Sequence, residues 1–115
     1  MTDCIFCRIA SGEIPATIVK RSPHAVAFRD LDPKAPTHVL VIPTTHVASA
    51  RDAKGSDGEK FLGRLLAFAT EVATDLGLDA GGYRIVTNTG PDGGQSVFHL
   101  HLHLLGGRKL TWPPG

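Results

Sequence analysis

The chain has 115 residues, 42% of them hydrophobic, and a formal net charge of +1 at pH 7. This length fits one domain, residues 1–115, and the small net charge argues against nucleic acid or a membrane surface as a partner. Apolar runs stay well short of the roughly 20 residues that span a bilayer, and the first residues lack the basic and apolar stretches of a secretory signal, so we expect a cytoplasmic protein.

The first half of the chain alternates short apolar runs with turn residues. A short helix is expected over residues 4–11, with Gly12 as its stop. Three strands are then predicted, at residues 17–20, 25–29 and 37–42.

One long helix is expected in the second half. Ser56 and Glu59 fit a capping box that opens it, and apolar residues keep helical spacing until Gly77 closes it. The rest is predicted to form a hairpin of two strands, residues 83–89 and 96–105. Together these elements predict an α+β fold, in which one long and one short helix pack on a five-stranded antiparallel sheet.

Half of the six histidines, His99, His101 and His103, alternate within five residues. On a strand, such positions share one face, about 7 Å apart per step. This spacing argues against the interpretation that the histidines lie on a solvent-exposed strand face by chance. One straight strand would also spread the three rings over about 14 Å, too far to converge on a single ion. The opposite face is expected to be core and carries Phe98, Leu100, Leu102 and Leu104.

The loop before the histidines is suited to anions. In the run Asp92-Gly93-Gly94-Gln95-Ser96, glycine lets several backbone N–H groups point one way, and Ser96 adds a hydroxyl donor. Such a loop is usually only a turn. Directly before a row of imidazoles, it indicates an anion cradle beside a nucleophile, because neutral imidazole can form a covalent phosphorus intermediate that water later cleaves.

The run Gly94–Leu105 resembles the signature of the histidine triad (HIT) superfamily, His-x-His-x-His followed by two apolar residues. Further segments resemble the family's opening, third strand and end, namely Ile5–Ile9, Glu13–Ala16, Ala35–Pro43, Leu105–Gly107 and Trp112–Gly115. The last segment, together with Ser96, is similar to the histidine triad nucleotide-binding (HINT) branch.

This resemblance implies a purine nucleoside 5′-phosphoramidase that binds purine nucleoside monophosphates. His101 would attack the α-phosphorus, and His103 would contact the phosphate and help to protonate the leaving amine. His99 completes the triad, and Ser96 would hold phosphate oxygens with Asn88 and Gly94. Asp30 would bind the ribose hydroxyls, and the base pocket would consist of Ile5, Phe6, Ile9, Ile14, Phe28 and Leu40.

The resemblance also implies a homodimer whose two sheets join into one of ten strands. Three other functions stay open: a dinucleoside polyphosphate hydrolase, a nucleotidyl transferase, or a nucleotide-binding module without catalysis. His38 recurs in the family beside the triad, although the residues alone favour an ordinary strand histidine.

Cys4 and Cys7 form a C-x₂-C pair near the N-terminus. A thioredoxin-type redox motif would follow a strand, and only three residues precede this pair. Two buried thiols in a short helix are one interpretation. The other is a closed zinc site, which needs two further ligands, and the resemblance implies His46 and His99 for these positions. We therefore expect a structural Zn²⁺ and no catalytic metal.

Overall fold

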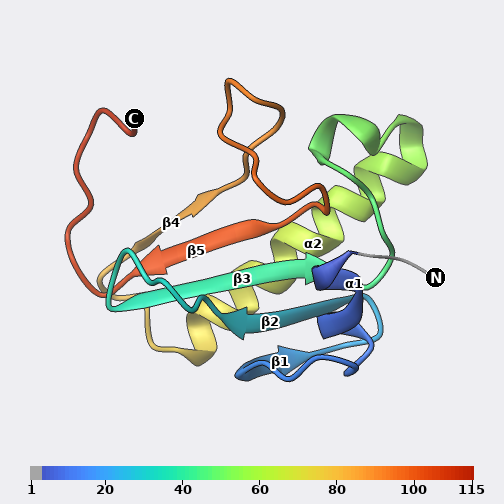
Figure 1. The fold of residues 1–115 in the computed structure, drawn as a ribbon. Coiled ribbons are helices and arrows are strands. Elements are labelled where there is room, and N and C mark those ends of the chain that lie inside the picture. The colour runs from blue at the N-terminus through green and yellow to red at the C-terminus, as the bar shows by residue number, and fades with distance from the viewer. Residues whose placement is uncertain (1–3) are drawn as a thin grey trace.

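The computed structural model describes residues 4–115 and confirms the α+β prediction (Figure 1). Its sheet has the order β1-β2-β3-β5-β4, and each neighbouring pair is antiparallel. Within this part of the chain, no helix is both long and apolar enough to cross a membrane. In chain order the elements are α1 (Ile5–Ala10), β1 (Ile18–Arg21), β2 (Ala25–Arg29), β3 (Thr37–Pro43), a 3₁₀ turn (Ala50–Asp52), α2 (Gly55–Asp75), β4 (Tyr83–Val86) and β5 (Leu102–Gly106).

The two helices lie on opposite faces of the sheet (Figure 1). Val39 and Val41 of β3 pack in the core with α2, whereas Leu40 and Ile42 pack with Phe6 of α1. Since side chains alternate along a strand, His38 of β3 belongs to the α1 face, where His103 of β5 also lies. The face opposite the long helix is therefore where the histidines gather.

The last strand is shorter than predicted, because it begins at Leu102 instead of residue 96. Residues before it bond to the end of β3 and the loop that follows, not to a strand ladder. The Leu100 N–H donates to the Val47 carbonyl over 2.6 Å, and the His99 ring contacts the Pro43 carbonyl. Leu100, Leu102 and Leu104 are buried as expected, but Phe98 is 61% exposed, so its assignment to the core was wrong.

The long helix begins two residues earlier than the capping box predicted, because that box places the N-cap at Ser56. α2 starts at Gly55 with Lys54 at its N-cap, and the Lys54 side chain makes no capping bond. The Lys54 carbonyl already accepts the Gly58 N–H, which places Ser56 inside the first turn. A Cβ on Gly58 would lie 2.4 Å from the Ala53 carbonyl carbon, so a close backbone contact accompanies this start.

Candidate functional site

His101 lies just before β5 and is only 6% exposed. Its Nδ1 is 2.7 Å from the His99 carbonyl oxygen. A carbonyl oxygen can only accept, so Nδ1 carries a hydrogen and the neutral ring has its lone pair on Nε2. The imidazole is held in position by the edge of Phe6, whose ring centroid is 5.1 Å away. The backbone carbonyl of His99 thus leaves the lone pair of the neutral His101 ring on Nε2.

Hydrogen bonds from Lys34 through His38 determine which ring nitrogen of His103 carries its hydrogen. The Lys34 backbone N–H donates to His38 Nδ1 over 3.0 Å, so neutral His38 carries its hydrogen on Nε2. That Nε2 lies 2.9 Å from His103 Nδ1. His103 must accept there, and its own hydrogen is then on Nε2. The His101 and His103 ring centroids are 5.1 Å apart, which brings a ring with an available lone pair close to a ring with an available N–H.

Burial keeps these donor rings neutral near pH 7. Mainly burial, with the neighbouring His101 and His38 rings adding to it, lowers the pKa of His103 to about 4. Burial also lowers the pKa of His38, against the opposing effect of the Asp30 carboxylate. Loss of hydration disfavours a charged imidazolium. His38, for which the residues alone favoured an ordinary strand histidine, is therefore a partner of the triad, which only the register of β3 against β5 reveals.

Asp30 lies between two cavities. Its Oδ1 accepts the Asp32 N–H over 2.8 Å, and its Oδ2 is 3.4 Å from His38 Nε2. It lines an apolar cavity of about 230 Å³ and also a cavity of about 400 Å³ beside His38, Asn88 and His103. The apolar cavity is lined by all six residues predicted for the base pocket, Ile5, Phe6, Ile9, Ile14, Phe28 and Leu40.

The glycine-rich loop is fixed by Gln95, a residue that the sequence analysis did not single out. Gln95 is 8% exposed; its Oε1 accepts the Gly90 N–H, and its Nε2 donates to the Ala48 and Val97 carbonyls. Nothing in the local pattern distinguishes this glutamine from a solvated loop residue. Gly94 has φ +81°, and Ser96 is exposed. Of the predicted phosphate ligands, Asn88 lines the cavity beside His103, whereas Gly94 and Ser96 line neither cavity.

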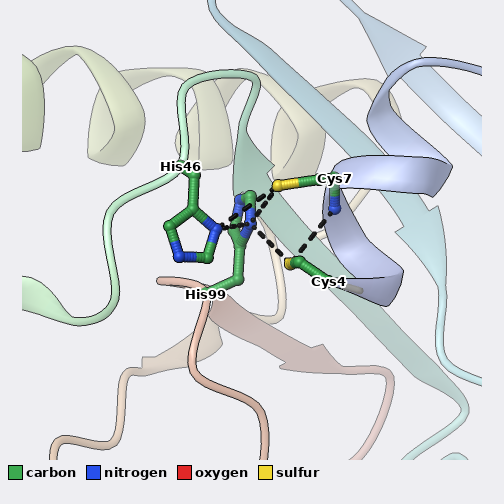
Figure 2. Close-up of side chains that lie close together, drawn as sticks. All are labelled: Cys4, Cys7, His46 and His99. Carbon is green, nitrogen blue, oxygen red and sulfur yellow. Dashed lines mark hydrogen bonds between the residues drawn. The ribbon is translucent and has the colours of Figure 1, made fainter. Parts of the chain in front are cut away.

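Four side chains from distant parts of the chain converge beside this site. Figure 2 shows Cys4 and Cys7 from α1, His46 from the loop after β3, and His99 from the segment before β5. His99 Nδ1 lies 3.2 Å from Cys4 Sγ, 3.4 Å from Cys7 Sγ and 3.1 Å from His46 Nδ1. These are the four residues that the resemblance implied as a metal site, and their ligand atoms all lie within 4.8 Å of one another.

The chemistry of these donors fits a tetrahedral zinc ion. Zinc bonds of 2.0–2.3 Å put tetrahedral nitrogen and sulfur ligands roughly 3.3–3.8 Å apart, close to the separations here. His99 Nε2 is 3.0 Å from the Pro43 carbonyl, which requires a hydrogen on Nε2 and leaves Nδ1 free to coordinate. Burial also lowers the pKa of His99 and so favours its neutral form. A second cluster, Asp30, His38 and His103, does not fit, because the hydrogen on His38 Nε2 occupies the position that a metal would need.

Comparison with known proteins shows to which family the chain is similar. The model of the HIT domain family matches residues 11–110. A protein from Zea mays named 14 kDa zinc-binding protein is 48% identical over 112 residues, covering 96% of this chain and 87% of its own. The crystal structure of a HIT family hydrolase from Legionella pneumophila is 50% identical, with a TM-score of 0.93, and covers 98% of this chain and 100% of its own. A histidine triad nucleotide-binding protein from Candida albicans is 31% identical, with a TM-score of 0.81, and covers 96% and 83%.

Proposed function

The chain belongs to the HIT domain family, and we propose that it is a purine nucleoside 5′-phosphoramidase of the nucleotide-binding branch. The observation that carries the proposal is the pair of fixed tautomers: His101 offers the lone pair of Nε2, and His103 offers an N–H on the neighbouring ring. A module that only binds nucleotides needs donors to the phosphate but no prepared lone pair. The pair therefore favours an enzyme over a binding module.

The reaction has two steps on these residues. In the first, His101 Nε2 forms a bond to the α-phosphorus while the bond from phosphorus to the amine breaks, and the His103 Nε2–H passes a proton to the departing amine and is replaced by a proton from solvent. In the second, water attacks the phosphorus while the bond from phosphorus to His101 Nε2 breaks, and the proton that water loses returns to solvent by way of His103. This releases the nucleoside monophosphate and leaves both rings neutral.

The two cavities support the nucleotide as the substrate class. A base in the apolar cavity and a phosphate beside His103 would place the sugar between them, next to Asp30. Its carboxylate can accept hydrogen bonds from the two ribose hydroxyls. Asn88 lines the same cavity as His103 and can donate to a phosphate oxygen. For Gly94 and Ser96 we propose the same role once the phosphate is bound.

A side-by-side comparison of substrates tests the proposal. Adenosine 5′-phosphoramidate, ATP and diadenosine polyphosphates are incubated with the protein side by side, and we expect cleavage of the phosphoramidate to be fastest. His101→Ala should abolish turnover yet still bind AMP, because only the nucleophile is removed. His24→Ala, a change at an exposed histidine away from this site, is the control. Preferred cleavage of a diadenosine polyphosphate would favour the dinucleoside polyphosphate hydrolase instead, and wild-type turnover by His101→Ala would refute the nucleophile.

We further propose that Cys4, Cys7, His46 and His99 hold a structural Zn²⁺. With all four positions filled by protein, the bound ion would have no open position for substrate and would join α1 to the end of β3 and the segment before β5. Because such an ion binds only the folded chain, its binding free energy adds to stability. Purified protein should contain about one zinc per chain and melt at a lower temperature after chelation. A melting temperature indifferent to the chelator would contradict this.

A further inference from the structure

His99 takes part both in the cluster with the two cysteines and His46 and in the hydrogen bond that fixes His101. Its ring Nδ1 faces the two cysteines and His46, whereas its backbone carbonyl accepts the Nδ1–H of His101 over 2.7 Å. The candidate metal site and the nucleophile therefore share a residue. Any movement of the His99 ring that rotates its peptide group also moves the acceptor that fixes the His101 tautomer.

Phe6 provides a second contact between the same two places. It lies between Cys4 and Cys7 in sequence and is 7% exposed. Its ring meets the His101 ring edge-on at 5.1 Å and the His99 ring at 5.9 Å. The position of α1, which the two cysteine ligands would anchor, thus limits where the His101 ring can lie.

The backbone around His99 lies outside the ladder of the sheet. Residues 97–101 do not belong to a strand, and the sheet ladder to β3 begins only at Leu102. Hydrogen bonds hold the neighbouring residues, from Gln95 Nε2 to the Val97 carbonyl, from the Leu100 N–H to the Val47 carbonyl and from Thr87 Oγ1 to the His101 carbonyl. At His99 itself the ring makes the contacts, through Nε2 to the Pro43 carbonyl and through Nδ1 in the cluster. In a regular strand, hydrogen bonds of the sheet ladder would fix the position of the His99 carbonyl. Here the contacts of the His99 ring fix it.

We propose that His99 is a positioning residue, and that metal held by Cys4, Cys7, His46 and His99 sets the tautomer and orientation of His101. This extends the structural zinc to a role in the rate of nucleotidyl transfer, and it rests on the proposed function for that rate. Without a fixed acceptor at Nδ1, the neutral ring can carry its hydrogen on either nitrogen and lose the lone pair at Nε2. Misplacement of a reacting group by about 1 Å can cost about 100-fold in rate.

The test compares zinc-loaded and metal-free protein labelled with ¹⁵N-histidine. In the loaded form, we expect the His101 Nδ1–H resonance to be present and slow to exchange with water. In the metal-free form, we expect it to be lost, with kcat lower by about 10- to 100-fold, and both readouts restored by added Zn²⁺. Val72→Ala, in the core on the α2 face, is the stability control: it should lower the melting temperature but keep the resonance and kcat.

Two results would overturn the proposal: a folded metal-free protein that keeps the resonance, or one that loses it with kcat unchanged. Failure of the loaded protein to cleave phosphoramidates would instead refute the proposed function, and the resonance would still test the positioning role.

If the metal-free chain unfolds, cobalt-loaded protein is used instead, because the visible spectrum of the bound cobalt reports on its ligands. Coupling between two sites is reciprocal, so His101→Ala should shift that spectrum and Val72→Ala should not. Identical spectra for wild type and His101→Ala would also overturn the proposal.

Discussion

In three histidine rings of the site, a hydrogen bond with a backbone group determines whether one of the ring nitrogens carries a hydrogen. The His99 carbonyl requires a hydrogen on His101 Nδ1, the Lys34 N–H requires a lone pair on His38 Nδ1, and the Pro43 carbonyl requires a hydrogen on His99 Nε2. Because main-chain groups do not titrate near neutral pH, this pattern does not change when a neighbouring side chain gains or loses a proton. The lone pair of His101 and the N–H of His103 are consequences of it.

His103→Ala tests the donor role. If the His103 Nε2–H protonates the leaving amine, its loss matters most when the leaving group is strongly basic and cannot depart as an anion. We expect a larger fall in kcat/KM for alkylamine phosphoramidates than for substrates with a weakly basic leaving group. A series of leaving groups of increasing basicity measures this dependence. An equal fall across the series would show that His103 contributes only to binding.

The low pKa of His103 makes a prediction about stability. Its pKa is about 4 in the folded protein and about 6.5 when unfolded, so between these values the unfolded chain binds more protons. The free energy of unfolding should therefore fall as pH falls through this range, by at most about 1.4 kcal/mol per pH unit for this residue. Above pH 6.5 the contribution is fully present.

His103→Asn removes that titration while keeping a polar side chain. Urea unfolding of both proteins at several pH values from 6.5 to 4 gives the comparison. Loss of metal at low pH affects both proteins alike, so the difference between the two slopes reports His103. Parallel slopes would contradict the lowered pKa.

At the scale of elements, sequence periodicity predicted the sheet and both helices, whereas only the resemblance to the HIT superfamily implied the residues around the apolar cavity. Alternation of leucine with histidine identified the buried face of residues 100–104, because burial on one side of a strand imposes a period of two. It could not reveal that the strand begins only at Leu102. Residues 97–101 have the same alternation, but their backbone bonds go to Val47 and their His99 ring to the Pro43 carbonyl. Contacts so distant along the chain leave no local pattern, and the same holds for His38 and Gln95.

The glycines of α2 allow a matched test of the helix start. Gly58→Ala should destabilise by about 1–3 kcal/mol, because its Cβ would lie 2.4 Å from the Ala53 backbone and cannot be accommodated without a shift of the main chain. Gly63→Ala, in the same helix with nothing within 4 Å of the added Cβ, should stabilise by about 0.5–1 kcal/mol. Chemical denaturation measures both. Stabilisation by both changes would show that the contact between Gly58 and Ala53 imposes no constraint.

At the scale of the whole molecule, the sheet ends in two edges that differ. At one edge, the pairing of β1 with β2 shifts register between Ile18 and Lys20, an irregularity that discourages further pairing. At the other edge, β4 pairs regularly with β5, and Tyr83 and Ile85 stay only partly buried against the core. Leu66 of α2 is 48% exposed. A regular edge strand favours pairing with a second copy, and we expect the joined sheet to bury α2, where Leu66 lies, at the interface.

We therefore predict a homodimer in which β4 pairs antiparallel with its twofold copy to join two sheets into one of ten strands. A twofold interface uses the same patch on both subunits, so Leu66→Glu would introduce two charges into it and should shift the protein towards monomer. Leu31→Glu is the matched control, because Leu31 is 99% exposed on the loop after β2 and away from β4. Light scattering at micromolar concentration measures both variants and the wild type. A wild-type protein that is monomeric and still fully active would contradict the prediction, as would a Leu66→Glu variant that remains as dimeric as Leu31→Glu.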